Sequence, residues 1–281
     1  METNNIAISI NKDSCIKCGR CARVCPHKIM NQDKKGEILV THIDFCSRCG
    51  HCVDVCPTDS IQHSTFSSEN IHTIDYSTLP TPEQVMLLIK SRRSNRSMTS
   101  NPIPKEMLEQ IIEAAQYAPT AVNTRQISFT IITEHDKLED ISNFTIKTFG
   151  SLTKILKNPI VKCVLKPFLE DVYKNIPLLE KFKEEQKKGN DPILRKATVL
   201  LIIHTPKSNR WGKAEANMAY QNASLMAQSL GISQIYMGFV LKAIEQDCKG
   251  SLLKKLGITG KVQAVMALGL PTFKYPKYVD R

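Results

Sequence analysis

The sequence predicts an α+β protein of two domains, a small cysteine-rich domain followed by a larger one with a mostly antiparallel central sheet surrounded by helices. Three observations predict this class. Two cysteine runs of identical spacing stand within the first sixty residues, β-rich runs further on are separated by helices of irregular length, and no strand is followed by GxGxxG. A chain of 281 residues also suits two domains.

The cysteine runs predict iron chemistry. They read Cys15-x2-Cys18-x2-Cys21-x3-Cys25-Pro26 and Cys46-x2-Cys49-x2-Cys52-x3-Cys56-Pro57. A cubane cluster takes one thiolate at each iron, so four closely spaced cysteines suit one 4Fe-4S cluster. Two all-thiolate zinc sites or four disulfides are the alternatives, but zinc ribbons usually pair two CxxC knuckles across a longer gap. The spacing favours two clusters.

The same runs resemble those of the bacterial two-cluster ferredoxins, including the prolines that follow the last cysteine of each run. In that family the fourth cysteine of each run ligates the cluster of the other run. The resemblance therefore implies that cluster one is held by Cys15, Cys18, Cys21 and Cys56, and cluster two by Cys46, Cys49, Cys52 and Cys25.

An internal duplication predicts the elements of the first domain, residues 1–75. Short strands over Ile6 to Ile10 and Ile38 to Ile43 each precede a cysteine loop, and a helical turn is expected after each final cysteine. The polar sequence from His63 to Pro82 indicates connecting chain, of which residues 76–82 form the linker.

Apolar periodicity predicts three helices and a helical segment in the second domain, residues 83–281. The first helix follows Pro82, with Val85, Leu88 and Ile89 on one face. The others are expected over Lys105 to Tyr117, over much of the charged segment 136–194, and over Lys213 to Leu230, where small residues permit close packing. The β-rich runs are Ser128 to Thr133, Thr198 to His204 and Val262 to Leu268.

A basic segment at the end of the first of these helices is a candidate phosphate site. Lys90 to Arg96 holds three arginines and two serines, and guanidinium forks bind phosphate bidentately. A helix C-terminus favours cations in any case, so by itself the segment also fits an ordinary solvated surface.

Four motifs in order resemble the nitroreductase family of FMN oxidoreductases over about residues 83–281. They are Arg92-Arg93-Ser94-x-Arg96; Ala118-Pro119-Thr120-Ala121-x-Asn123; Leu230-Gly231-Ile232 with Tyr236-Met237-Gly238; and Ala267-Leu268-Gly269-Leu270-Pro271 with Lys274-Tyr275-x-Lys277-x3-Arg281.

The resemblance implies roles for these positions. It assigns the flavin phosphate and ribityl chain to Arg92, Arg93, Ser94 and Arg96, and a further phosphate contact to Lys277 and Arg281. It assigns the flavin ring to Pro119, Thr120, Ala121 and Asn123, donated by a partner subunit, and the N5 edge to the backbone of Met237 and Gly238. An intertwined homodimer with two flavins follows.

Two regions depart from the family or vary within it. The family often carries Gln-Pro-Trp shortly after the matching asparagine, where this chain has Arg125-Gln126-Ile127, so the substrate-side wall differs. The segment 136–194 lies where such enzymes vary most, and a lid over the flavin and a helical excursion without that role both stay open.

Together the two halves predict an FMN-dependent oxidoreductase, with FMN and two 4Fe-4S clusters as cofactors, that reduces a small nitro, quinone or enone electrophile. A ferredoxin or NAD(P)H is the expected electron donor. The alternatives are a non-enzymatic electron carrier or redox sensor, and a flavoenzyme of the reductive dehalogenase type. No catalytic acid or base is evident, and both Tyr236 and His204 fit packed residues better than catalytic ones.

Composition indicates which binding partners and which cellular compartment to expect. The formal net charge is +11, but lysines alternate with glutamates, as at 180–188, which is typical of a solvated helix face and not of a nucleic-acid site. Apolar runs such as Ala264 to Leu270 are too short to span a bilayer, and clusters require a reducing compartment, so a cytoplasmic protein is expected. Cys163 and Cys248 are expected to be small buried residues.

Overall fold

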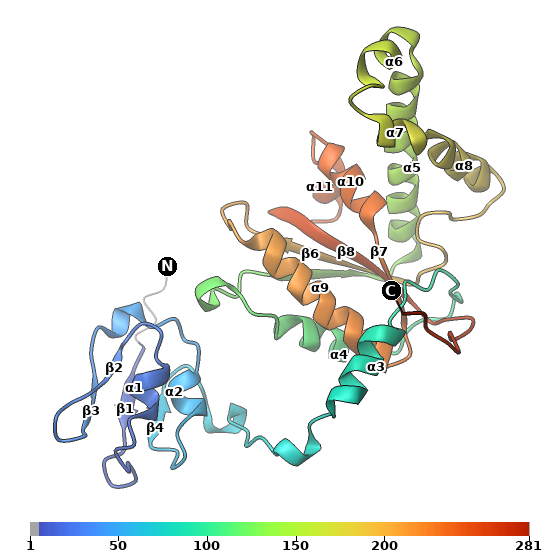
Figure 1. The fold of residues 1–281 in the computed structure, drawn as a ribbon. Helices are drawn as coiled ribbons and strands as arrows, with labels where there is room; N and C mark the ends of the chain where they lie inside the picture. The colour runs from blue at the N-terminus through green and yellow to red at the C-terminus, as the bar shows by residue number, and fades with distance from the viewer. Residues whose placement is uncertain (1–5, 281) are drawn as a thin grey trace. The chain divides into compact units, whose positions relative to one another are not determined.

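The computed structural model describes residues 6–280, and Arg281 lies outside the described residues. The chain divides into two compact units (Figure 1). The first holds the chain up to Leu79 together with Val122–Thr124, and the second holds Pro80–Ala121 and the chain from Arg125 onward. No helix in residues 6–280 is long and apolar enough to cross a bilayer.

The first unit contains two small antiparallel sheets and two short helices. Strand β1 (Ile8–Ile10) pairs with β4 (Ile61–His63), and β2 (Met30–Gln32) pairs with β3 (Ile38–Val40). Helices α1 (Arg20–Val24) and α2 (His51–Asp54) pack against each other. The short helices η1 (Ile43–Phe45), η2 (Ser68–Asn70) and η3 (Tyr76–Thr78) complete the unit.

The duplicated pattern is present, but its helical turns lie elsewhere than expected. Each helix contains the third cysteine of a run and ends before the fourth. A turn but no helix follows each final cysteine, so the expectation of a helical turn there is wrong. Cys25 closes α1 in an extended conformation, with ψ 110°. The proline that follows it explains this, because a residue before proline is disfavoured in the helical region.

The second unit is built on a four-stranded sheet in the order β5-β6-β8-β7, with every neighbouring pair antiparallel. The strands are β5 (Ser128–Ile132), β6 (Val199–Thr205), β7 (Ser233–Tyr236) and β8 (Lys261–Gly269). The expected antiparallel sheet and three of its strands are confirmed, and β7 was not expected.

Helices cover both faces of this sheet (Figure 1). On one face, α4 (Lys105–Gln116) and α9 (Gly212–Ser229) pack over Val199, Leu201 and Ile203. On the other, α5 (His135–Lys157) and α10 (Gly238–Gln246) pack over Leu200 and Ile202. Because both faces are covered, every residue of β6 is buried, which explains the run of five apolar residues at its start.

The segment expected to be helical between β5 and β6 contains α5 and three further helices: α6 (Pro159–Leu165), α7 (Glu170–Lys174) and α8 (Ile176–Lys187). Asn158 caps α6, because its side chain accepts from Ile160 and Val161, and Pro159 occupies the first turn. The short helix α11 (Ser251–Lys255) lies between α10 and β8, and the short η4 (Ala121–Asn123) follows α4.

Helix α3 (Pro82–Ser91) begins at a capping box, in which the side chains of Thr81 and Gln84 each accept from the other's backbone N–H, with Pro82 in the first turn. The expected apolar face is present, but Val85 and Ile89 remain 40% and 45% exposed in the single chain. Only Leu88 of that face is partly covered. The helix therefore presents apolar side chains that its own chain does not bury.

Candidate functional site

The eight cysteines of the two runs line two separate cavities in the first unit. One cavity is lined by Cys15, Cys18, Cys21 and Cys56, and the other by Cys25, Cys46, Cys49 and Cys52. Each cavity thus combines three cysteines of one run with the fourth of the other, which is the grouping that the resemblance implies. The assignment of these cysteines as cluster ligands stays a prediction.

Backbone amides point at the exchanged cysteines. The N–H of Ile29 donates to Cys25 Sγ at 3.2 Å, and the N–H of Ser60 donates to Cys56 Sγ at 3.3 Å. Donors of this kind stabilise a negatively charged sulfur, so the surroundings fit thiolate ligands.

The surroundings of the cysteines shift the pKa values of their thiols in different directions. Burial raises the pKa of Cys52 to about 11 and also raises the pKa of Cys21. Burial acts the same way on Cys56, but hydrogen bonds from Thr58 and Ser60 outweigh it and hold the pKa of Cys56 below its usual value.

None of the ten cysteines forms a disulfide. Among residues 6–280, no three His, Cys, Asp or Glu side chains converge closely enough to share one metal ion. A cubane places each thiolate on a different iron, so its ligands surround a volume and do not meet at a point. The two cysteine-lined cavities have that form.

In the second unit, the chain after β8 runs alongside the arginine segment, although more than 170 residues separate the two in sequence. Ser97 Oγ lies 2.6 Å from Thr272 Oγ1, and Met98 forms a β-bridge with Pro271. Arg93 Nη2 donates to the carbonyl of Val279 at 3.4 Å. The fold therefore brings the segment of Arg92, Arg93, Ser94 and Arg96 together with the segment of Lys277.

Two buried carboxamides hold this arrangement. Asn95 Nδ2 donates to the carbonyl of Phe273 at 3.0 Å. Gln234 in β7 is 1% exposed; its Nε2 donates to the carbonyl of Arg93 at 3.3 Å, and its Oε1 accepts from Tyr220 OH at 2.6 Å. Ser94 also forms a parallel bridge with Gln234. The arginine segment is thereby fixed to the edge of the central sheet.

The charges of this segment are available to an anion. Lys90 pairs with Asp280 at 2.7 Å, but within residues 6–280 none of Arg92, Arg93 and Arg96 forms an ion pair with a carboxylate. Guanidinium groups that are close in sequence and have no carboxylate partner fit a phosphate group.

Met237 and Gly238 lie where β7 ends and α10 begins. Met237 is buried, and its N–H donates to the carbonyl of Val265 at 2.9 Å. The first amides of a helix have no partner within it and carry the positive end of its dipole. This junction therefore offers backbone donors from Gly238 onward, of the kind that the resemblance assigns to the flavin edge, whereas the N–H of Met237 is already taken by Val265.

The loop after α4 is held by a buried carboxylate. Glu215 of α9 is 1% exposed; its Oε1 accepts from Ala121 N–H at 2.8 Å and its Oε2 from Asn209 Nδ2 at 2.8 Å. Pro119 is exposed, and Thr120 Oγ1 accepts from the N–H of Arg125 at 3.0 Å. Asn123 groups with the first unit.

Val122 in this loop has φ 45°. A positive φ is an outlier for a β-branched residue, so the loop is backbone-strained at that point.

The helical segment 135–187 packs on α10 through aromatic rings. Phe239 of α10 meets Phe149 of α5 and Phe182 of α8 edge to face, with ring centroids 5.4 and 5.1 Å apart. These helices thus contact the side chain next to Gly238, which remains 38% exposed. A lid role for the segment stays a prediction.

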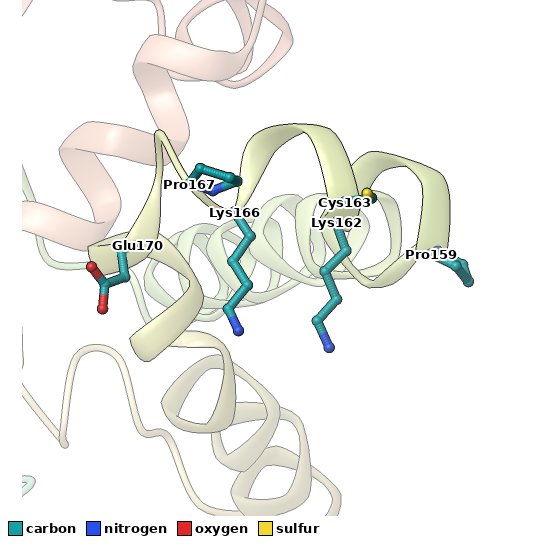
Figure 2. A pocket seen from close by; sticks show the side chains of 6 residues that line it. All are labelled: Pro159, Lys162, Cys163, Lys166, Pro167 and Glu170. Atoms are coloured by element: carbon teal, nitrogen blue, oxygen red, sulfur yellow. The ribbon is translucent and has the colours of Figure 1, made fainter.

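An open groove is formed by α6, the start of α7 and the residues between them. None of its lining residues belongs to the cysteine cavities, the arginine segment or the aromatic cluster at Phe239. Figure 2 shows Lys162 and Lys166 extending to the same side of α6, with Glu170 of α7 near one end. Cys163 also lines the groove. Cys163 and Cys248 are both exposed, so the expectation that they are buried is wrong.

Tyr236 and His204 have different surroundings. Tyr236 is 39% exposed and packs on the ring of Tyr220, so it is not the core residue that was expected; partial burial raises the pKa of its phenol. His204 is buried, with Nδ1 3.0 Å from the carbonyl of Thr259 and Nε2 3.1 Å from Thr130 Oγ1. The expectation of a packed histidine is confirmed.

Comparison with known proteins identifies both halves. Residues 89–270 match the nitroreductase family, and residues 7–57 match the 4Fe-4S dicluster domain. An FMN reductase [NAD(P)H] of Bacillus subtilis (strain 168) is 27% identical over 163 residues, which are 56% of this chain and 55% of that relative. The chain therefore spans about half the length of this curated relative.

Solved structures share the fold of the second unit. A nitroreductase with bound FMN from Bacteroides fragilis matches with a TM-score of 0.51 and 23% identity, covering 70% of this chain and 95% of that one. A nitroreductase with bound FMN from Desulfitobacterium hafniense matches with a TM-score of 0.53 and 16% identity, covering 70% and 93%. Identities this low show a common fold.

Proposed function

Because the chain belongs to the nitroreductase family and carries a 4Fe-4S dicluster domain, we propose that it is an FMN-dependent oxidoreductase that receives electrons through two 4Fe-4S clusters. The acceptor is a small electrophile of the nitro, quinone or enone type. The observation that carries the proposal is the pair of cavities, each lined by four cysteines drawn from both runs.

The cluster ligands are the cysteines of each cavity. Cluster one is held by Cys15, Cys18, Cys21 and Cys56, and cluster two by Cys25, Cys46, Cys49 and Cys52. The backbone donors to Cys25 and Cys56 support thiolate ligation at both exchanged positions. The first domain is residues 1–75, joined by the linker 76–82 to a flavin domain of residues 83–281.

The FMN phosphate is bound by the arginine segment and the C-terminal segment. The residues are Arg92, Arg93, Ser94, Arg96 and Lys277, with Arg281 outside the described residues. The absence of carboxylate partners for the arginines in residues 6–280 supports this, and buried Gln234 and Asn95 orient the segment. Pro119, Thr120, Ala121 and Asn123 face the ring bound by a partner subunit.

Bound FMN supplies a group that takes electrons singly and gives them up as a pair, which suits donation from one-electron clusters. The part of this chain is to position the ring and stabilise charge on it. Amides at the start of α10, next to Met237 and Gly238, donate toward a developing negative charge. Phe239, next to Gly238, packs edge to face on Phe149 and Phe182 and so ties the start of α10 to the helical segment.

The protein works as a homodimer in the cytoplasm, with a ferredoxin or NAD(P)H as donor and no nucleic-acid or membrane partner. The exposed apolar face of α3 supports an interface, and thiolate-bound clusters need a reducing compartment.

The test is anaerobic reconstitution followed by iron, sulfide and flavin analysis. Reduced ferredoxin or NAD(P)H should bleach the flavin absorbance, and a nitroarene should restore it with turnover. Protein that carries iron but no flavin would refute the proposal. Reduction without turnover of any nitro, quinone or enone compound would indicate an electron carrier instead.

A further inference from the structure

His63 lies at the end of β4, with its ring buried beside the cavity lined by Cys25, Cys46, Cys49 and Cys52. Its Nε2 lies 3.5 Å from Cys46 Sγ, and its Nδ1 lies 3.2 Å from the backbone nitrogen of Thr65. A backbone N–H can only donate, so Nδ1 is the acceptor and the ring proton is assigned to Nε2. The imidazole therefore donates a hydrogen bond to the sulfur of Cys46.

The ring is held in this orientation from several sides. Phe66 packs on it with ring centroids 4.9 Å apart, and the strand register places Ile8 opposite His63. The Thr65 amide fixes the far nitrogen. The donor to Cys46 is therefore fixed in position before any electron arrives.

The other half of the duplication has no such donor at the equivalent position. Gln32 stands seven residues after Cys25, as His63 stands seven residues after Cys56. Its Nε2 donates to the carbonyls of Lys17 and Gly36, at 2.8 and 3.0 Å. Gln32 thus stabilises a loop, whereas His63 contacts a sulfur.

The other hydrogen bonds to cysteine sulfurs do not give the first half of the duplication a donor that matches His63. The amides that donate to Cys25 and Cys56 are matched, at 3.2 and 3.3 Å. Within residues 6–280, the other side-chain donor near a run cysteine is Thr58, whose Oγ1 lies at a longer 3.9 Å from Cys56 Sγ and also 2.8 Å from Ser60 Oγ. A ring N–H at 3.5 Å is the stronger donor of the two.

We infer that His63 tunes cluster two, on Cys25, Cys46, Cys49 and Cys52, by raising its reduction potential through the hydrogen bond to Cys46. The inference rests on the cofactors of the proposed function. A cluster that gains one electron becomes more negative, and a donor to its ligand sulfur stabilises the reduced form more than the oxidised one. The proton remains on Nε2 throughout, so only an electron moves. His63 is a positioning residue and has no contact with substrate.

The experiment is an anaerobic redox titration of the full chain, followed by electron paramagnetic resonance. His63→Phe keeps an aromatic ring but removes the donor, and His63→Gln keeps an N–H at nearly the same reach. In His63→Phe, one of the two clusters should shift to lower potential while the other stays unchanged. In His63→Gln, both should titrate close to the wild-type protein.

The matched control is Gln32→Leu, which removes the side-chain donor at the equivalent position of the other half. Both cluster potentials should stay close to the wild-type values, because Gln32 donates to carbonyls and not to sulfur. An unchanged pair of potentials in His63→Phe overturns the inference, and so does an equal shift of both clusters. Iron and sulfide are measured first, since a wild-type protein without two clusters contradicts the proposed function and not the role of His63.

If His63→Phe does not load both clusters, the decisive measurement is made on protein labelled with ¹⁵N-histidine. One reduced cluster of the wild-type protein should show a nitrogen hyperfine coupling that is lost in labelled His63→Gln. His27 and His51 also line this cavity, and the comparison with the glutamine variant removes their contribution. A coupling that persists in the variant, or none in the wild type, overturns the inference.

Discussion

At the scale of single residues, Cys25 and Cys56 matter most for the clusters, because each lines the cavity of the other run. Cys56 lies in the second run, yet it lines the cavity of Cys15, Cys18 and Cys21, and amide and hydroxyl donors hold the pKa of its thiol below the usual value. It is therefore well suited to serve as a thiolate ligand, and it belongs to both halves of the duplication.

Replacement of Cys56 by serine should remove or alter one cluster while the flavin stays bound. We expect ferredoxin-driven turnover to fall by at least about tenfold, since a lost ligand breaks the electron route. Cys163→Ser is the matched control, because Cys163 is exposed and belongs to neither run. Electron paramagnetic resonance and flavin absorbance check the result, and equal loss of iron and flavin would instead mean that the fold has collapsed.

His204 should make stability depend on pH. Burial lowers its pKa in the folded chain, although the hydrogen bond to Thr259 opposes this, so the unfolded chain binds more protons at His204. The stabilisation is complete above the unfolded pKa of about 6.5 and is lost as the pH falls below it. Between about pH 7.5 and about pH 5.5, the free energy of unfolding should fall more in the wild type than in His204→Gln.

Trp211 provides the measurement for this prediction. It is the single tryptophan of the chain and stands at the start of α9, in the second unit with His204. Denaturant titrations followed by its fluorescence give the free energy of unfolding at each pH. Equal falls in both proteins would show that His204 is not the titrating group.

Residues with a fixed local spacing could be predicted from the sequence, and residues that act through distant contacts could not. The cysteine runs and the arginine segment are local patterns, and the structure gathers them as expected. Gln234, Glu215 and His63 were missed because their partners lie far along the chain: Gln234 contacts Arg93, and Glu215 contacts Ala121. For Glu215, the sequence signal was a carboxylate among the small residues of a helix expected to pack closely.

At the scale of elements, the junction of β6 and β8 depends on one glycine. The register of this pair shifts between Ile203 and His204, and Gly260 precedes β8 with φ 90°. A Cβ at Gly260 would lie 2.3 Å from the carbonyl oxygen of Thr205. No side chain fits there unless the backbone moves.

Gly260→Ala should therefore destabilise the second unit by about 2–4 kcal/mol, the sum of backbone strain and a steric clash. Gly189→Ala is the control, because Gly189 has φ 81° but open space around its Cβ position. It should cost only the strain, about 1–2 kcal/mol. Denaturant midpoints measure both, and similar losses in the two variants would contradict the role given to the Thr205 contact.

Some strands could be predicted from the sequence and others could not, depending on their length and on how apolar they are. β6 and β8 are long and buried, so their apolar runs stand out in the sequence. β7 has four residues and includes Ser233 and Gln234, buried polar residues that hide the apolar pattern. β2 and β4 have three residues each, too few for a period-two pattern to show.

At the scale of the whole molecule, helix α3 has an apolar face that the rest of its own chain does not bury. Val85, Met86, Leu87 and Ile89 are 40–55% exposed on a helix that begins at a well-formed capping box. Sequence periodicity predicted an apolar face, but periodicity does not say whether that face packs within the chain or against a second copy.

A double substitution of Val85 and Ile89 by glutamate should weaken the proposed homodimer by at least about tenfold in dissociation constant, because two charges would be buried at the interface. Flavin content should fall with it, since the resemblance places each flavin between subunits. Ile160→Glu is the control, as Ile160 is 76% exposed on α6. Analytical ultracentrifugation and flavin absorbance test this, and a dimer unaffected by the double change would place the interface elsewhere.

The exchange of the fourth cysteines also sets an order in time. As the chain leaves the ribosome, the cavity of the first run has only three of its cysteines until Cys56 emerges. The cavity of the second run is complete as soon as Cys52 emerges, because Cys25 has long been available. The cluster site whose run comes later in the sequence is thus the first that the growing chain can fill.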